Sequence, residues 1–468
     1  MFEPKTYASR RARLAERLGG GLVLVPGNRL SPMNYADNSF DFRQDGTFRY
    51  YFGLNLPDFW ATIDADTGES ILYGHEPTLD EVVWMGPQPA LAELADLAGV
   101  DSTGDSGDLA TRIGDAAAAG RPLLFLPQYR PENQRRLSEL TGIPVGELDL
   151  RASRPLMEAV IEQRLVKEPA EIVEMERAGE IAHTMHTFAM RAVRPGLHEA
   201  EVAGRVRGLA LAAKGDISFP IIFSVRGEVL HNHTWSNVMG AGDLVVHDSG
   251  AVTNTGYCSD ITRTFPVSGT YDPRQKDVYE AVLQAQLDAI DAMAPGVPFV
   301  DVHLTAARTL AGALVDIGLL AGSPDDIVEA GAHALFFPHG LGHMIGLDVH
   351  DGEAISEEIT GYGTEAVRSE QFGLSALRLA RPLRPGWVVT VEPGAYFIPP
   401  LIRKWRQDNR HAGFINYDRL DDWLDFGGVR IEDDVLVTEE GTRILGPAIP
   451  KTVDDVERTM AETAELGL

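Results

Sequence analysis

The sequence is poor in cysteine, in long apolar runs and in positive charge. Its single cysteine, Cys258, excludes an intramolecular disulfide and favours a reducing compartment. No apolar run is long enough to span a bilayer, and the first twenty residues predict a charged helix without the apolar core of a signal peptide. Lys and Arg number 41 against 69 Asp and Glu, and the net charge of −28 argues against a nucleic acid or an anionic membrane as partner. These shortages favour a cytoplasmic globular protein.

The length and the apolar content indicate two domains. A chain of 468 residues exceeds one ordinary domain, and 44% apolar residues suffice for a full core. In the first third, apolar segments at 21–27 and 122–127 predict buried strands. Alternating residues around the turn Asp66–Gly68 predict further strands and a hairpin over 42–74. We therefore expect a small α/β domain over residues 1–160, with the seam near 156–167.

The remaining residues, 161–468, predict a mixed α+β domain. Apolar residues recur at helical spacing over 168–193, 199–214, 274–294 and 301–317, and Pro195-Gly196 ends the first of these helices. Short strand-like stretches lie between and after the helices. We expect these stretches to form a curved sheet that carries the chemistry.

Five residues in those stretches suggest a metal site. Each lies in an apolar strand or at a strand end, and together they provide four carboxylates and one imidazole, a set suited to manganese, cobalt, zinc or iron. Four converging carboxylates would repel one another without cations. Two divalent ions between them could share a water and make it a hydroxide near neutral pH. The five residues are Asp248, Asp260, His343, Glu392 and Glu432.

The spacing of residues along the strands supports this interpretation. Period-2 alternation places Asp248 on the apolar face of its strand and His247 on the other, so His247 is interpreted as a packed histidine. The turn at 253–256 would bring Asp248 and Asp260 together across a hairpin. Arg430 and Glu432 share a face, so the guanidinium could support a bridging carboxylate or meet a substrate. Other candidates for chemistry are interpreted as core residues: Cys258, His183, His186, His303 and His333.

Longer motifs around these residues resemble a known family. The motifs are DSGA with YCSDITRTFPVSG, HGLGHMIGLDVHD, VEPGAYF and GGVRIEDD. They resemble the binuclear metallopeptidases of the pita-bread fold, which include aminopeptidase P, prolidase, methionine aminopeptidase and creatinase. The resemblance runs from about Arg164, and FRQDGTFRYYFGL is similar to the N-terminal domain of aminopeptidase P and prolidase.

The resemblance implies a role for each ligand. It implies a pita-bread catalytic domain with a curved antiparallel sheet, in which Asp248 chelates one metal and His343 and Glu392 bind the other. Asp260 and Glu432 would bridge both ions. Manganese and a homodimer are also implied by the resemblance, while the ligand set itself leaves cobalt, zinc and iron open.

Further residues are expected to meet the substrate. Histidines His339 and His350 flank His343 in a Gly-rich loop and would donate protons to the tetrahedral intermediate or to the leaving imide nitrogen. Glu392 would accept a proton as well as bind metal. Upstream, His231 and His233 both fit the position of a substrate histidine, and the choice between them stays open.

Two features favour prolidase within the family. The insert 351–386 resembles the prolidase loop and carries Arg378, fourteen residues before Glu392, where prolidases place an arginine that binds the carboxylate of a dipeptide. Arg430 is the competing candidate for that role. The span between Glu392 and Glu432 is also long, as in prolidases. We therefore expect a metal-dependent hydrolase that cleaves Xaa-Pro dipeptides with a metal-bridging hydroxide.

Two alternatives remain. An aminopeptidase P would instead release the first residue of longer Xaa-Pro peptides. A non-catalytic, peptide-binding pita-bread domain belongs to a different functional class. Relatives of that kind have lost metal ligands, whereas this chain has all five.

Overall fold

The computed structural model describes residues 1–462, and the chain forms two compact units. The first unit comprises Met1–Arg164 and Gly352–Ile359, and the second comprises Leu165–Asp351 and the chain from Thr360 onward. The domain boundary between residues 160 and 161 stays a prediction. Among the described residues, no helix combines the length and the hydrophobicity that crossing a bilayer requires.

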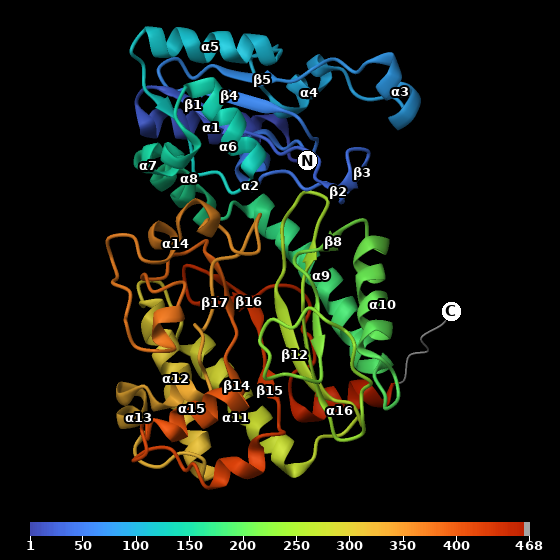
Figure 1. Cartoon of the computed structure of the whole chain (residues 1–468), viewed down its shortest axis with the longest axis vertical. Helices are drawn as coiled ribbons and strands as arrows, with labels where there is room; N and C mark the ends of the chain where they lie inside the picture. Colours follow the sequence, from blue (N-terminus) through green and yellow to red (C-terminus); the bar gives the residue numbers. More distant parts are fainter. Residues whose placement is uncertain (463–468) are drawn as a thin grey trace. The chain divides into compact units, whose positions relative to one another are not determined.

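The first unit is built on a five-stranded sheet in the order β6-β5-β4-β1-β7 (Figure 1). Strands β1 and β4 pair antiparallel, and Leu22, Leu24 and Trp60 from them pack with Ile113 and Phe125 in a buried core. The elements of this part of the chain are α1 (Pro4–Leu18), β1 (Leu22–Pro26), β2 (Pro32–Tyr35), β3 (Asn38–Ser39), α2 (Gly46–Phe52), β4 (Trp60–Asp64), β5 (Ser70–Tyr73), α3 (Leu79–Met85), α4 (Leu91–Ala98), β6 (Ser102–Gly104), α5 (Ser106–Ala118), β7 (Leu123–Leu124), α6 (Pro131–Thr141), α7 (Leu148–Arg151) and α8 (Arg154–Leu165).

In the first unit, one expected strand is shorter than predicted and one expectation was wrong. The strand expected over 122–127 is reduced to Leu123–Leu124, which is only half-buried. The segment Gly46–Phe52, expected to be part of a strand region, is helix α2. Asp45 caps this helix by accepting a hydrogen bond from the Phe48 backbone N–H, and Gly53 ends it in the left-handed conformation. Every residue of α2 is buried, so its sequence has no polar face that periodicity could detect.

The four helices expected in the second unit are confirmed, with bounds within two residues of those predicted. They are α9 (Pro169–Ala192), α10 (Glu199–Ala212), α11 (Pro273–Ala292) and α12 (Phe299–Asp316). Their buried residues recur three and four positions apart, as the apolar periodicity required. The remaining helices of the chain are α13 (Pro324–Ala330), α14 (Glu353–Gly361, interrupted at Ser356), α15 (Pro399–Gln407) and α16 (Val453–Ala461).

The second unit consists of two similar halves, each a helix pair beside antiparallel strands (Figure 1). In the first half, α9 and α10 contact strands β8, β9, β11 and β12; in the second, α11 contacts β13, β14 and β15, with α12 packed on α11. A bridge between Thr262 and Glu432 joins the halves. The strands are β8 (Asp216–Ile217), β9 (Ile222–Ser224), β10 (Leu244–Ser249), β11 (Ala251–Val252), β12 (Ile261–Pro266), β13 (Val388–Val391), β14 (Gly394–Tyr396), β15 (Gly428–Arg430), β16 (Asp433–Val437) and β17 (Thr442–Ile444). The predicted α+β class is confirmed.

The hairpin between Asp248 and Asp260 has space only for glycine at its first bend. Strands β10 and β12 pair antiparallel over Leu244–Ser249 and Ile261–Pro266. A Cβ atom at Gly250 would lie 1.7 Å from the Ser259 carbonyl oxygen and 2.4 Å from the Ser218 hydroxyl oxygen. The contact with the Ser259 carbonyl oxygen can be relieved only by moving backbone, so this close approach fixes the bend between the two aspartates.

A matched pair of glycine substitutions tests this constraint. Gly250→Ala should lower the melting temperature, because overpacking a tight site costs about 1–3 kcal/mol. Gly204→Ala should raise it slightly, because this exposed glycine lies within α10 with no atom near the added Cβ, and alanine favours a helix by about 1 kcal/mol. Thermal unfolding monitored by circular dichroism measures both. Equal stability of the two variants would contradict the close approach.

Candidate active site

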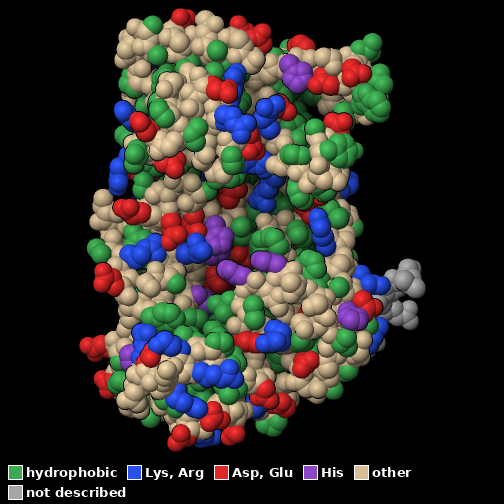
Figure 2. All heavy atoms as spheres, viewed as in Figure 1, with side chains coloured by type: hydrophobic (Ala, Val, Ile, Leu, Met, Phe, Trp, Pro, Cys, Tyr) green, Lys and Arg blue, Asp and Glu red, His purple; other side chains and the backbone are tan. Residues whose placement is uncertain are grey.

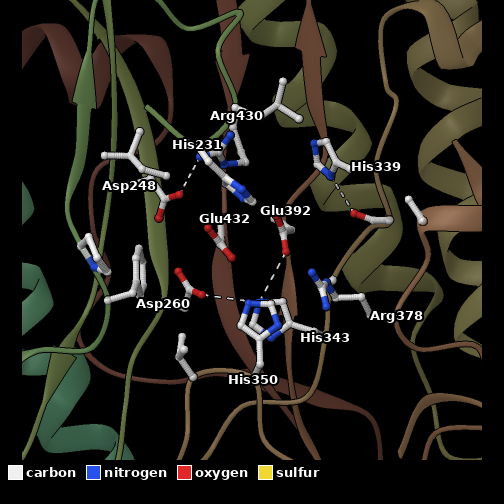
Figure 3. Close-up of a pocket in the computed structure, with 18 of the residues that line it drawn as sticks. His231, Asp248, Asp260, His339, His343, His350, Arg378, Glu392, Arg430 and Glu432 are labelled. Atoms are coloured by element: carbon white, nitrogen blue, oxygen red, sulfur yellow. Dashed lines mark hydrogen bonds and ion pairs between the residues drawn. The ribbon is translucent and has the colours of Figure 1, made fainter. Parts of the chain in front are cut away.

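A cavity of about 350 Å³ lies in the second unit and gathers every residue predicted for the site. Figure 2 shows histidine and acidic side chains close together where the visible surface is hollowed, and Figure 3 shows them converging from several strands and loops. The predicted residues that line it are Asp248, Asp260, His343, Glu392, Glu432, His339, His350, His231, His233, Arg378 and Arg430.

The five expected metal ligands lie in or beside strands. Asp248 is within β10, while Asp260 and Glu392 adjoin β12 and β13. Glu432 lies between β15 and β16, and His343 lies beside the bridge from Met344 to Val389. One ligand atom each from Asp260, His343 and Glu432 lies within 4.8 Å of the other two. Because the halves meet at the bridge between Thr262 and Glu432, ligands from distant parts of the sequence reach one point.

His343 has the orientation of a metal ligand. Its Nδ1 lies 3.1 Å from the Met344 carbonyl oxygen, which can only accept, so Nδ1 carries the proton. The bare Nε2 then faces Asp260 Oδ2 at 3.5 Å and Glu392 Oε1 at 3.7 Å. A lone pair directed at two carboxylates is repulsive by itself. The arrangement becomes favourable when a cation lies among the three groups.

The protonation of the carboxylates leads to the same conclusion. Burial, together with neighbouring carboxylates, raises the pKa of Asp260 and Glu432 well above the usual range and that of Glu392 to about 7. Among the described residues, the buried Asp248 Oδ1 has no hydrogen-bond partner. Oxygen and imidazole donors of this kind fit hard or borderline divalent cations, so the residues present fit the expected metals.

Arg430 provides a cation within the site, and its carboxylate partner is Asp248. Its Nη2 lies 2.6 Å from Asp248 Oδ2, across the halves rather than along its own strand. The Nε atom donates to Thr262 Oγ1 at 3.1 Å, and that hydroxyl donates to Glu432 Oε2 at 2.6 Å. Arg430 therefore reaches the expected bridging ligand, Glu432, only through Thr262.

Tyr396 was missed by the sequence analysis and connects Arg430 to His339. Arg430 Nη1 donates to the Tyr396 hydroxyl at 2.9 Å, and that hydroxyl lies 2.9 Å from His339 Nε2. His339 Nδ1 donates to the Gly340 carbonyl oxygen at 2.8 Å, so Nε2 accepts from Tyr396. Burial lowers the pKa of His339 to about 3, which keeps the ring neutral. Period-2 spacing along VEPGAY, with Glu392, Gly394 and Tyr396 on one face, was the available signal.

Two acidic residues after Glu432 were also missed. Asp434 Oδ2 accepts from the Asp260 backbone N–H at 3.0 Å and so orients that ligand. Asp433 pairs with Arg263 and Lys451, each at 2.7 Å, behind the site. In the sequence, three successive acidic residues resemble a solvated run, and only the apolar residues on both sides of them indicated burial.

A buried ion pair anchors the loop that carries His350. The His350 ring stacks on that of His343, with centroids 4.0 Å apart and planes inclined by 11°. The next residue, Asp351, accepts from Lys167 Nζ at 2.8 Å, and both side chains are 1% exposed. A Cβ atom at Gly346 would lie 2.4 Å from Asp351 Oδ2, so the loop closes tightly over the pair. His350 is therefore held against a predicted ligand.

The other predicted residues line the cavity at its edges. His231 and His233 lie on the loop between β9 and β10, with ring centroids 6.4 Å apart, and both reach the cavity. The choice between them therefore stays open. Arg378, half-buried on the insert, lines the cavity as well.

Of the residues interpreted as core, His183 is only half-buried, and the others are buried. The ring of His247 is fully buried, points away from the cavity and stacks on His186 with centroids 4.1 Å apart. Cys258, His303 and His333 are buried as expected.

Known proteins are similar to the chain over almost its whole length. Residues 173–439 match the model of metallopeptidase family M24, and residues 7–125 match that of the aminopeptidase P N-terminal domain. The Xaa-Pro dipeptidase of Homo sapiens is 33% identical over 477 residues, which cover 97% of this chain and 93% of that protein. A probable Xaa-Pro aminopeptidase of Coccidioides posadasii is 31% identical over 469 residues, covering 96% of each.

Solved structures also match the chain over almost its whole length. Pseudomonas aeruginosa aminopeptidase PepP has a TM-score of 0.81 at 28% identity and covers 98% of each chain. Zinc-substituted Escherichia coli aminopeptidase P in complex with product has a TM-score of 0.80 at 26% identity and covers 99% of each chain. These similarities confirm the resemblance and the predicted fold. With more than half of its residues matched by the family model, the chain belongs to metallopeptidase family M24.

Proposed function

We propose that this protein hydrolyses the Xaa-Pro imide bond of dipeptides with two divalent metal ions, and that manganese is the ion it uses. The observation that carries the proposal is the convergence of four carboxylates and the bare Nε2 of His343 on one cavity. The Xaa-Pro dipeptidase named among its relatives supports the substrate class. Cobalt, zinc and iron fit the same donors.

Each ligand has a proposed place in this chemistry. Asp248, Asp260, His343, Glu392 and Glu432 would hold the ions, which when bound polarise a carbonyl group and lower the pKa of water. Glu392 is also the proposed proton acceptor.

The histidines have different proposed roles. His350, stacked on His343, would donate a proton or hydrogen bond to the substrate during the reaction. His339 is neutral and accepts from Tyr396, so it would line the substrate site and keep Tyr396 and Arg430 in position. Either His231 or His233 would contact the substrate from the opposite wall.

Arg378 is proposed to bind the carboxylate of the dipeptide. That carboxylate lies just beyond the proline, and leaving it unpaired in a partly desolvated pocket is costly. Arg378 lines the same cavity as the predicted metal ligands and brings a guanidinium to it from the insert. An aminopeptidase P must leave the same direction open to the rest of the peptide. The solved aminopeptidase P relatives favour that second function.

A homodimer and a cytoplasmic location are also proposed, from the family resemblance and the composition. Light scattering coupled to size-exclusion chromatography would test the dimer. Fractionation of cells with an antibody to the chain would test the location.

Metal removal should make the stability of the protein depend on pH. In the metal-free fold, burial raises the pKa of Glu392 from 4.5 to about 7, and the fold therefore holds a proton that the unfolded chain releases. The metal-free protein should thus lose stability as pH rises from about 4.5 to about 7. Metals displace these protons, so the loaded protein lacks this loss. The difference in melting temperature between loaded and chelated protein should grow over that range. A difference independent of pH, or full activity after chelation, would contradict the proposal.

Two histidine substitutions should separate metal binding from turnover. His343→Ala should lower the metal content, measured by elemental analysis, from about two ions per chain toward one. His350→Ala should keep both ions and lose about 10²–10⁴-fold in kcat, because it removes a donor without removing a ligand. Normal turnover of Gly-Pro by His350→Ala would show that its proposed role is wrong.

A substitution at Arg378 should distinguish the dipeptidase function from the aminopeptidase function. Arg378→Ala should raise KM for Gly-Pro by roughly 10-fold or more, because it leaves the carboxylate without a partner. The KM for the amide analogue Gly-Pro-NH2 should change little. Arg384→Ala, on the same insert but outside the residues lining the cavity and paired with Glu365, is the control. If the wild type hydrolyses Gly-Pro-Xaa tripeptides as well as Gly-Pro, the aminopeptidase function is correct.

A further inference from the structure

The loop that brings His231 and His233 to the cavity has little internal structure of its own. It runs from Val225 to Asn237 between β9 and β10, without a helix or strand. Several of its side chains are exposed, including both histidines. Two of its side chains bond to the segment before it: Asn232 Nδ2 donates to Ser224 Oγ at 2.9 Å, and Trp235 Nε1 donates to the Ile221 carbonyl oxygen at 3.1 Å. Gly227 packs closely against Gly428, whereas the segment 229–236, which carries both histidines, is exposed or half-buried. The position of that segment therefore depends strongly on what holds the two ends of the loop.

Both ends are hydrogen-bonded to one buried carboxylate, that of Glu199. The Val225 backbone N–H donates to Glu199 Oε1 at 2.8 Å. The Asn237 backbone N–H donates to Oε2 at 3.1 Å, and its side-chain amide lies 3.0 Å from each oxygen. The Glu199 backbone N–H in turn donates to the Asn237 carbonyl oxygen at 3.1 Å. Glu199 has no solvent exposure.

The position of Glu199 in the fold suits this function. It is the first residue of α10, where the N-terminal end of the helix dipole favours a negative charge. Hydrogen bonds to a charged acceptor are stronger than those between neutral groups. A rigid helix of 14 residues therefore fixes both ends of a thirteen-residue loop through one side chain.

We propose that Glu199 is a positioning residue, which clamps the loop 225–237 and thereby places its histidines at the substrate. The substrate part of this inference rests on the proposed Xaa-Pro hydrolysis. The clamping of the loop by Glu199 does not rest on that function, because the hydrogen bonds are present without substrate. Nothing in the clamp touches the five predicted metal ligands directly, so its loss should affect substrate binding more than metal binding.

Two substitutions and a control on the same helix test the clamp. Glu199→Ala removes every hydrogen bond to the carboxylate. Glu199→Gln keeps the shape and one acceptor oxygen, so its effects should be intermediate, and it serves as the second variant if Glu199→Ala folds poorly. Glu201→Ala is the control, because Glu201 lies two residues along α10 and caps His198 without contacting the loop.

Two measurements report on the clamp. Limited proteolysis with trypsin needs no substrate: Arg226 is exposed and is the only Lys or Arg within the loop, so cleavage after it reports on the mobility of the loop. This cut should be roughly 10-fold faster in Glu199→Ala than in the wild type and unchanged in Glu201→Ala. Steady-state kinetics on Gly-Pro should show KM raised by roughly 10-fold or more, kcat changed less, and metal content unchanged.

The outcomes separate this inference from the proposed function. Faster cleavage together with a raised KM in Glu199→Ala, with Glu201→Ala like the wild type, supports the clamp. Cleavage at the wild-type rate, or a lowered melting temperature with KM unchanged, overturns it. If the wild type does not hydrolyse Xaa-Pro peptides, the proposed function is wrong, and the rate of cleavage after Arg226 still decides whether Glu199 holds the loop.

Discussion

The repulsion among four carboxylates in one cavity is the constraint on which the second unit depends. Asp248, Asp260, Glu392 and Glu432 face one cavity, where burial opposes ionisation and each charge opposes the others. The surrounding contacts limit this cost. Arg430 compensates one carboxylate, and Thr262 donates to another. The remaining carboxylate charges become favourable only when a cation binds among them. These unpaired charges therefore supply the affinity of the site for a cation.

Much of the site could be predicted from the sequence because its ligands interrupt apolar strands. Asp248 lies in an apolar strand, with Val246 two residues before it and small residues after it. A carboxylate in such a strand is costly to bury unless it faces a cation. The helices α9 to α12 were equally accessible, since each has one buried and one exposed face. Helical periodicity and an isolated charge in an apolar strand are local features, so both can be recognised in a single sequence.

The features that were missed depend on pairing between distant segments or on complete burial. Helix α2 has no exposed face, so its residues gave no helical period. The partner of Arg430 could not be found along its own strand, because Asp248 reaches it from β10 in the other half of the unit. Tyr396 needed the same knowledge of which strand ends meet. Asp433 and Asp434 were misleading, since an acidic run is usually solvated, whereas here both are buried.

The bridge between the two halves has a consequence for how the chain folds. Arg430 and Asp248 are 182 residues apart, and Thr262 and Glu432 are 170 apart. Closing loops of that length costs conformational entropy, and such contacts form late. The first half supplies only two carboxylates, and the second supplies His343, Glu392 and Glu432. Neither half therefore holds the full ligand set during synthesis or refolding, and tight cation binding reports that the whole unit, rather than any local motif, has folded.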